Sequence, residues 1–214
     1  MLHPYICLNI NTLSKNELKH FQSQWNHLVK DPYLPQQYGI RFRRHGSFEY
    51  NSATGLFIQL PSGSYEQSKE MNPVMGGIER KFQPLDLDKK ALNTLKGILN
   101  YGTMLFDVKG KWKMHTHMIR IPSHVSLIGW PSPEGVHSDG FEYIAIHLIA
   151  RKSIKGADTT IYDNNRNKLH QVTLEKPLDS IFAEDDKVMH HTTNFMSDNF
   201  GYRDTLLVSW NKVP

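Results

Sequence analysis

Cysteine is nearly absent from this sequence: the 214 residues include only Cys7, so the chain cannot form an internal disulfide. A single thiol fits a reducing compartment. Long apolar runs are missing as well, since no stretch approaches the roughly 18 residues that span a membrane. Residues 1–11 are too short and too polar to be a secretory signal. We therefore expect a cytoplasmic protein with no membrane partner.

A strong charge of either sign is also missing. The chain has 25 Lys and Arg against 21 Asp and Glu, a formal net charge of +4. Proteins that bind nucleic acids cluster their basic residues, and the one dense basic run here is residues 41–44. We therefore expect no nucleic-acid partner and a small-molecule substrate, which can be acidic. The oligomeric state is left open.

Apolar residues at helical spacing predict two helices. The first follows a capping-box pattern at Ser14 and is expected to run to about Lys30, and the second runs from Asp88 to near Tyr101. A first strand is expected over residues 2–11. From residue 113 onward, short β-branched and aromatic segments alternate with turn residues, which is typical of an antiparallel β structure.

This order of elements predicts an α+β, mainly β fold. We expect a double-stranded β-helix, that is, a jelly-roll or cupin-like barrel, with helices packed on one side. A length of 214 residues is most simply one domain, residues 1–214. The helical part is expected over about 12–110 and the barrel core over about 113–212.

The motif His137-Ser138-Asp139 comes just before a long apolar run. Residues two apart point to the same face of an extended chain, so His137 and Asp139 can reach one point in space. Together they offer two of the three ligands of a 2-His-1-carboxylate iron site. The third has to come from a later strand, where His190 and His191 point to opposite faces, and alternation does not choose between them. A surface turn after Asp139 explains the pair equally well.

Arg203 opens the last predicted strand and shares a face with Thr205 and Ser209. An arginine inside a barrel is costly unless it meets an anion, and a guanidinium suits a carboxylate. The pattern therefore predicts a site for the far carboxylate of a 2-oxo acid bound to the metal. The alternative is that this face points to solvent and Asp204 neutralises the arginine.

Three further segments leave alternatives open. His115 and His117 form a second pair two residues apart, a rival metal half-site that lacks a carboxylate. Residues 38–45 alternate apolar and basic side chains, as in a solvated edge strand or in a cationic wall facing a carboxylate substrate; composition favours the edge strand. Residues 61–77 are rich in Ser, Gly, Asn and Pro, so they predict a long loop that is a candidate lid.

Several of these segments together resemble the bacterial 2-oxoglutarate/Fe(II)-dependent dioxygenase family of L-isoleucine 4-hydroxylase. The resemblance extends from about Tyr38 to Trp210, is weakest over residues 59–75, and depends most on residues 131–140, 146–148, 186–190 and 201–204. It implies Fe(II), 2-oxoglutarate and O2 as cofactors, with His137, Asp139 and His190 as metal ligands and Arg203 as the arginine for 2-oxoglutarate. Basic residues of the relatives fall on the stretch 41–44 and on Arg120, so Arg43, Arg44 and Arg120 become candidates for the substrate side or for a structural role.

The resemblance also implies the reaction. It indicates hydroxylation of a small substrate, most simply a free L-amino acid, with succinate and CO2 as co-products. Asp139 supplies the carboxylate that related halogenases lack, and Thr205 or Ser209 would assist Arg203. The alternative is a non-catalytic metal- or ligand-binding jelly-roll protein, which would consume no oxygen. A zinc hydrolase is a third class, and it would work without oxygen.

Overall fold

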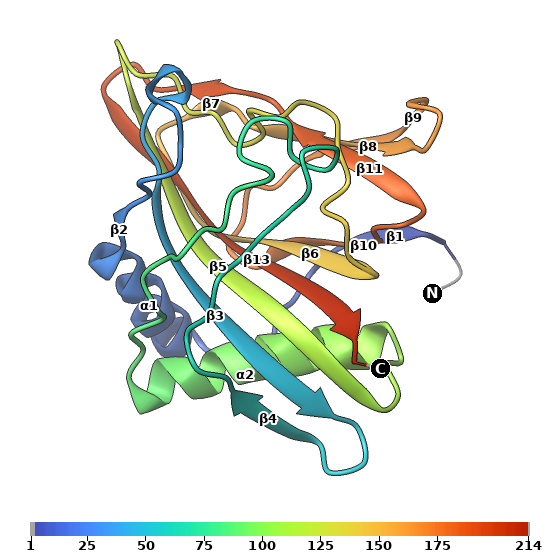
Figure 1. Cartoon of the computed structure of the whole chain (residues 1–214). Coiled ribbons are helices and arrows are strands. Elements are labelled where there is room, and N and C mark those ends of the chain that lie inside the picture. Colours follow the sequence, from blue (N-terminus) through green and yellow to red (C-terminus); the bar gives the residue numbers. More distant parts are fainter. Residues whose placement is uncertain (1–2, 214) are drawn as a thin grey trace.

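An eight-stranded antiparallel sheet is the frame of the computed structural model, which describes residues 3–213. Along it the strands follow the order β1-β10-β6-β13-β5-β3-β2, and β4 pairs with β3 (Figure 1). Their bounds are β1 Tyr5–Asn9, β2 Val29–Lys30, β3 Phe42–Asn51, β4 Leu56–Gln59, β5 Lys111–His124, β6 Tyr143–Lys152, β10 Asp179–Glu184 and β13 Phe200–Lys212.

Two smaller sheets cover one end of this frame. One has the strand order β11-β8-β9, and the other pairs β12 with β7. Figure 1 shows β7, β8, β9 and β11 in the upper part of the molecule. Their bounds are β7 Lys155–Gly156, β8 Asp158–Asp163, β9 Lys168–Thr173, β11 Val188–Thr192 and β12 Phe195–Met196. The predicted jelly-roll with helices on one side is confirmed.

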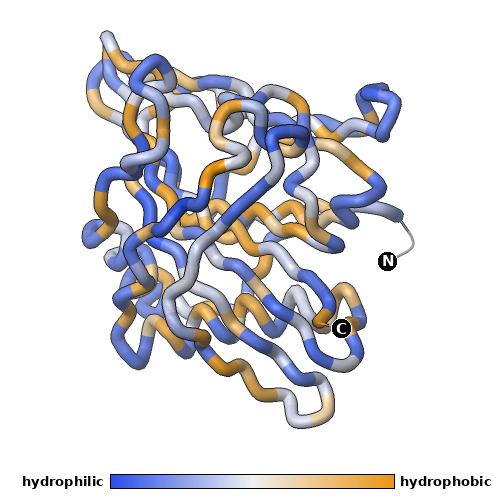
Figure 2. The backbone as a smooth tube through the Cα atoms, in the orientation of Figure 1, coloured by the Kyte–Doolittle hydropathy of each residue, from blue (hydrophilic) through white to orange (hydrophobic). Residues whose placement is uncertain are grey.

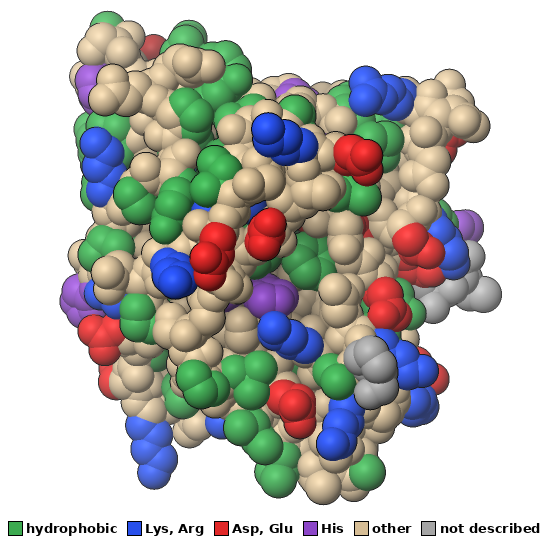
Figure 3. Space-filling view, in the orientation of Figure 1, with side chains coloured by type: hydrophobic (Ala, Val, Ile, Leu, Met, Phe, Trp, Pro, Cys, Tyr) green, Lys and Arg blue, Asp and Glu red, His purple; other side chains and the backbone are tan. Residues whose placement is uncertain are grey.

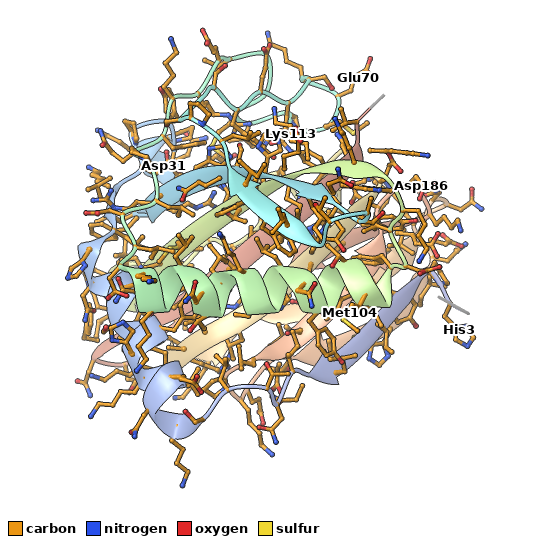
Figure 4. All side chains as sticks on the ribbon, turned by 90° about the horizontal axis from the view of Figure 1, so that it is seen from below. His3, Asp31, Glu70, Met104, Lys113 and Asp186 are labelled. Atoms are coloured by element: carbon orange, nitrogen blue, oxygen red, sulfur yellow. The ribbon has the colours of Figure 1, made fainter. Side chains whose placement is uncertain are left out.

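The second predicted helix lies across the outer face of the main sheet. It is α2, Lys89–Leu105, and the side chain of Asp88 caps it by accepting from Ala91 N at 2.8 Å. Its buried face, which includes Leu95 and Ile98, joins the main hydrophobic core. Figure 4 shows α2 on one side of the sheet, while Glu70, in the segment between β4 and α2, lies toward the other side.

The first helix is shorter than predicted. The capping box at Ser14 is present, but α1 covers only Lys15–Ser23 and continues as a 3-10 turn, η1, Gln24–His27. Leu28 is already extended, because the next two residues form β2 against β3. Main-chain pairing with the sheet therefore overrides the helical spacing, and the prediction of a helix to Lys30 is wrong.

Strand bounds near the N-terminus also differ from expectation. The predicted strand 2–11 is observed as Tyr5–Asn9, with Leu2 outside the described residues. The strand predicted over 38–45 begins later, at Phe42, because Tyr38 ends a second 3-10 turn, η2, Gln36–Tyr38. Through its pairing with β5, β3 becomes part of the main sheet.

Hydropathy follows this layering. In Figure 2 apolar segments gather along the central strands of the sheet, and the tip of the β8–β9 hairpin is hydrophilic. The main core lies between α1, α2 and the outer face of the sheet, and it includes Phe21, Phe182 and Trp210. Within residues 3–213, no helix combines the length and the apolar character needed to cross a membrane.

Candidate metal centre

The inner face of the main sheet borders a cavity. Side chains from β5, β6, β11 and β13 line it, together with residues 65–80 of the segment after β4 and residues 131–141 of the segment before β6. His137, Asp139, His190 and Arg203 are all among the lining residues. The topology thus brings four side chains predicted for one site into one cavity.

Three of these side chains converge. His137 Nε2 lies 3.7 Å from Asp139 Oδ1, and His190 Nε2 lies 3.8 Å from Asp139 Oδ2. One ligand atom from each residue lies within 4.8 Å of the others, and no other group of three such side chains in residues 3–213 has this spacing. Main-chain hydrogen bonds hold the two histidines side by side. His137 N donates to His190 O at 3.1 Å, and His190 N donates to His137 O at 2.7 Å.

Hydrogen bonding sets the tautomer of His137. Its Nδ1 lies 2.8 Å from Gly135 O, which can only accept, so Nδ1 carries a proton and Nε2 is the nitrogen left to bind a metal ion. Burial disfavours the imidazolium, but the carboxylates of Glu134 and Asp139 together outweigh burial and raise the pKa of His137. The surroundings of Nε2 therefore favour positive charge, as a metal-ion site requires.

His190 offers a neutral imidazole. Burial lowers its pKa to about 3, so the ring is uncharged at neutral pH. The neighbouring His191 points to the opposite face, is half-buried, and does not line the cavity. Two neutral imidazole nitrogens and one carboxylate are the donor set of a facial Fe(II) site, and the residues present fit such an ion.

Asp185 supports the loop that carries Asp139. It is almost fully buried, and its carboxylate accepts from the main-chain N–H of Asp139 at 3.1 Å, Gly140 at 2.7 Å and Phe141 at 2.9 Å. Burial, followed by the nearby Asp139 charge, raises the pKa of Asp185. Sequence reasoning missed this residue, because an Asp-Asp pair before a short strand has the pattern of an ordinary turn.

Arg203 faces the cavity. It is 4% exposed, its Nε and Nη2 have no hydrogen-bond partner, and Thr205 and Ser209 line the cavity beside it. Burial lowers the pKa of Arg203 to about 10, so the guanidinium stays charged at neutral pH. Asp204 points to the other face and pairs with Arg120, so the alternative that it neutralises a solvent-facing Arg203 is wrong.

Two basic residues, one just before β3 and one near its start, form a wall of the same cavity. Arg41 and Arg43 are both buried and line it, so the solvated edge strand is wrong for these two residues. The Arg43 guanidinium lies 4.6 Å from the centre of the Phe82 ring and 3.8 Å from Asp31. Phe42, between the two arginines, packs against the core on the helical side.

Arg44 and Arg120 do not reach the cavity. Arg44 donates to the main-chain oxygens of His27 at 2.9 Å and Pro84 at 2.7 Å. Arg120 donates twice to the Asp204 carboxylate at 2.7 Å and lies over the Tyr202 ring. Strand alternation explains both placements: their neighbours Arg43 and Ile119 face inward, so Arg44 and Arg120 face outward.

Sequence reasoning missed several cavity residues. Tyr65, Gln67 and Arg80 come from the irregular segment after β4, where no periodicity indicates which side chains point inward. Glu134 precedes the metal motif, and its Oε1 lies 3.1 Å from His137 Nε2. Figure 3 shows acidic and basic side chains intermixed on the face of the molecule that is seen in Figure 1.

The rival histidine pair has a different arrangement. His115 Nδ1 lies 3.0 Å from His45 Nε2, and His117 stacks on the His45 ring at 4.5 Å. Burial lowers the pKa of His45 to about 3 and of His115 to about 4, so both rings are neutral. No carboxylate completes a three-ligand group with them in residues 3–213.

Fold and site together define a class: a jelly-roll protein whose cavity holds a 2-His-1-carboxylate donor set suited to non-haem iron. The family model described as 2OG-Fe dioxygenase matches residues 22–209, so the chain belongs to this family. It is therefore an Fe(II)- and 2-oxoglutarate-dependent dioxygenase, and the non-catalytic alternative is set aside. The narrower resemblance to L-isoleucine 4-hydroxylase remains a prediction.

Solved structures share the fold. A BsmA homologue from Methylobium petroleophilum PM1 is 25% identical with a TM-score of 0.80, over 92% of this chain and 81% of that chain. IDO from Bacillus thuringiensis is 16% identical with a TM-score of 0.79, over 100% and 92%. TqaL, an Fe(II)/α-ketoglutarate-dependent dioxygenase, is 18% identical with a TM-score of 0.71, over 99% and 83%. A search of curated proteins gives no match.

Proposed function

We propose that this chain hydroxylates a free L-amino acid, using 2-oxoglutarate and O2 and releasing succinate and CO2. The observation that carries the proposal is the placement of a buried, unpaired Arg203 in the same cavity as the converging side chains of His137, Asp139 and His190. A cation without a carboxylate partner is costly there, and a dicarboxylate co-substrate removes the cost.

His137, Asp139 and His190 are the proposed metal ligands. Bound Fe(II) supplies the O2 activation that couples decarboxylation of 2-oxoglutarate to hydroxylation of a C–H bond. The chain would contribute two imidazole nitrogens and one carboxylate oxygen to the ion, and the remaining positions would be filled by the co-substrate and O2. The Gly135 carbonyl keeps the His137 ring in the orientation that directs Nε2 to the ion.

Arg203 is proposed to bind the far carboxylate of 2-oxoglutarate. Its two unpartnered N–H groups can make a bidentate pair, and the hydroxyls of Thr205 and Ser209 lie on the same strand face to donate to the remaining oxygen lone pairs. The apolar side chains of Ile146 and Leu207 line the cavity as well, and they exclude water from the co-substrate.

We propose that the part of the cavity that binds the substrate recognises a zwitterion. Arg43 has two buried nitrogens, Nε and Nη1, without hydrogen-bond partners, although Nη1 lies 3.8 Å from Asp31. Both N–H groups are free to donate to a carboxylate. Glu134 has a buried Oε2 without a partner, which suits an ammonium group. A free amino acid carries both groups on one carbon. Arg44 and Arg120 are not proposed for this role, because their guanidiniums are engaged outside the cavity.

The test is a turnover assay on purified full-length protein. The protein is loaded with Fe(II) under anaerobic conditions and then given O2, 2-oxoglutarate, ascorbate and a pool of L-amino acids. We expect succinate and one amino acid heavier by one oxygen in the mass spectrum, and neither with His137→Ala. Succinate at the level of the His137→Ala control would contradict the metal assignment. Succinate without any oxidised amino acid would contradict the substrate class alone.

A further inference from the structure

The segment between β4 and α2 is a closed loop. Figure 1 shows it running from β4 across the front of the main sheet toward the small sheets and back to α2. Its two arms are joined by the main-chain pair of Tyr65 and Arg80, with N–O distances of 2.9 and 3.0 Å. Gly77 N also donates to Gln67 O at 2.8 Å. These bonds hold the inward side chains of the loop in fixed places.

Three polar side chains fill the inside of this loop, and one amide connects them. Gln67, Asn72 and Arg80 are 8%, 3% and 1% exposed. Gln67 Oε1 accepts from Arg80 Nη2 at 2.9 Å and from Asn72 Nδ2 at 3.3 Å. Because a guanidinium can only donate, Arg80 fixes the direction of the amide, with the oxygen toward Arg80 and the amino group away from it.

The amino group of Gln67 faces the loop that carries Asp139. Gln67 Nε2 donates to the main-chain oxygen of Asp139 at 3.1 Å and lies 3.5 Å from Asp139 Oδ1. Arg80 lines the same cavity, and its Nε has no partner. One planar amide thus spans the distance between a cavity cation and a carboxylate that converges with His137 and His190.

We infer that Gln67 is a positioning residue that orients the Asp139 carboxylate and holds Arg80 toward the cavity. An anionic group bound beside Arg80 is thereby coupled to the metal side through a single side chain. A cation on the amide oxygen strengthens the N–H groups as donors, so the two ends of the amide are not independent. The inference rests on the proposed metal role of Asp139.

The experiment is a double-mutant cycle on metal affinity, which needs no turnover. Co(II) binding to the full chain is measured by calorimetry without O2 for the unmodified protein, Gln67→Met, Arg80→Met and the double variant. We expect Gln67→Met to weaken Co(II) binding about 10-fold, as loss of a hydrogen-bond partner of a metal ligand does. Arg80→Met should weaken it less, and the double variant should bind no more weakly than Gln67→Met. The Co(II) absorption bands should shift in Gln67→Met.

A control separates this role from a general effect on the loop. Gln83→Met changes an exposed glutamine of the same segment and should keep the Co(II) affinity within about twofold. Gln67→Asn keeps an amide but shortens it by one methylene, and it tests the same contact if Gln67→Met does not fold.

Two outcomes overturn the inference. One is an unchanged Co(II) affinity in both Gln67 variants. The other is a double variant in which the losses of Co(II) binding free energy caused by Gln67→Met and Arg80→Met add up. Failure of the proposed function gives a different result. In that case His137→Ala binds Co(II) as tightly as the unmodified chain, which shows that Co(II) does not bind at His137, Asp139 and His190.

Discussion

Arg203 is a buried cation whose charge no carboxylate in residues 3–213 balances within ion-pair distance. Arg203→Gln should raise the KM for 2-oxoglutarate roughly 10- to 100-fold, the range expected for losing hydrogen bonds to a charged group. Co(II) affinity should not change, because Arg203 is not a proposed metal ligand. Succinate formation measured against 2-oxoglutarate concentration gives the KM, and Arg44→Gln is the control with an unchanged value. An unchanged KM in Arg203→Gln would remove Arg203 from this role.

Arg43 and Arg44 are a matched pair, adjacent in sequence and on opposite faces of β3. Arg43→Gln should raise the KM for the amino-acid substrate at least about 10-fold, since a charge-assisted pair is lost. The KM for 2-oxoglutarate should stay the same. Arg44→Gln should leave both constants unchanged. Equal effects of the two variants would show that charge in this region, rather than contact in the cavity, governs substrate binding.

Single residues show where alternation is informative and where it is not. The i, i+2 rule correctly pairs His137 with Asp139 and separates Arg43 from Arg44. It does not say which face is inward, because both faces of β3 are covered: Phe42 packs on the helical side while Arg41 and Arg43 line the cavity. A buried arginine face therefore has the same sequence pattern as a solvated one.

Gly102 in α2 shows how a single glycine can lead to a wrong prediction of where a helix ends. The sequence pattern predicts that the helix fades near this glycine, yet α2 continues to Leu105. A Cβ on Gly102 would lie 2.6 Å from Cζ2 of the fully buried Trp210, so glycine is required by packing and not by helix termination. The partner comes from β13, more than a hundred residues away, and local periodicity cannot indicate it.

Two alanine substitutions in α2 should therefore have opposite signs. Gly102→Ala should lower the free energy of unfolding by about 1–3 kcal/mol through overpacking against Trp210. Gly97→Ala, where no atom lies within 4 Å of the added Cβ, should raise it by about 0.5–1 kcal/mol. Urea unfolding measures both. If Gly102→Ala also stabilised the protein, the contact between α2 and Trp210 would be looser than the structure shows.

The molecule as a whole is a sheet with an apolar face toward the helices and a second face that is polar around the cavity and apolar where it packs against β8 and β11. The first face follows from sequence periodicity, and the jelly-roll class could be predicted from the order of helices and short strands along the chain. The second depends on strand order, which brings β5, β6 and β13 side by side, and on a loop whose folding is set by Gln67, Asn72 and Arg80. Non-local contacts of this kind leave no periodic pattern.

This architecture also buries neutral histidines, which makes stability depend on pH. Burial lowers the pKa of His147 to about 3, and its Nδ1 donates to Ser180 Oγ at 2.8 Å. In the unfolded chain the imidazole has a pKa of about 6.5. Between about pH 6.5 and 3 the unfolded state therefore binds a proton that the folded state does not, and stability falls as the pH falls.

His147→Asn keeps a donor for Ser180 Oγ and removes this titration. The free energy of unfolding of the unmodified chain should decrease on going from pH 7 to pH 4.5, and in His147→Asn it should decrease less steeply, by up to about 1.4 kcal/mol per pH unit. Staying above pH 4.5 limits the contribution of carboxylates with a lowered pKa, such as Asp179. Burial raises the pKa of Asp185 and of Asp204 into this range, but both carboxylates titrate in the two proteins alike, so they do not change the difference between the slopes. Urea unfolding at four pH values gives both slopes. If the free energy of unfolding fell equally steeply with pH in both proteins, His147 would become protonated in the folded state. That result would contradict the lowered pKa that we attribute to its burial between β10 and β13.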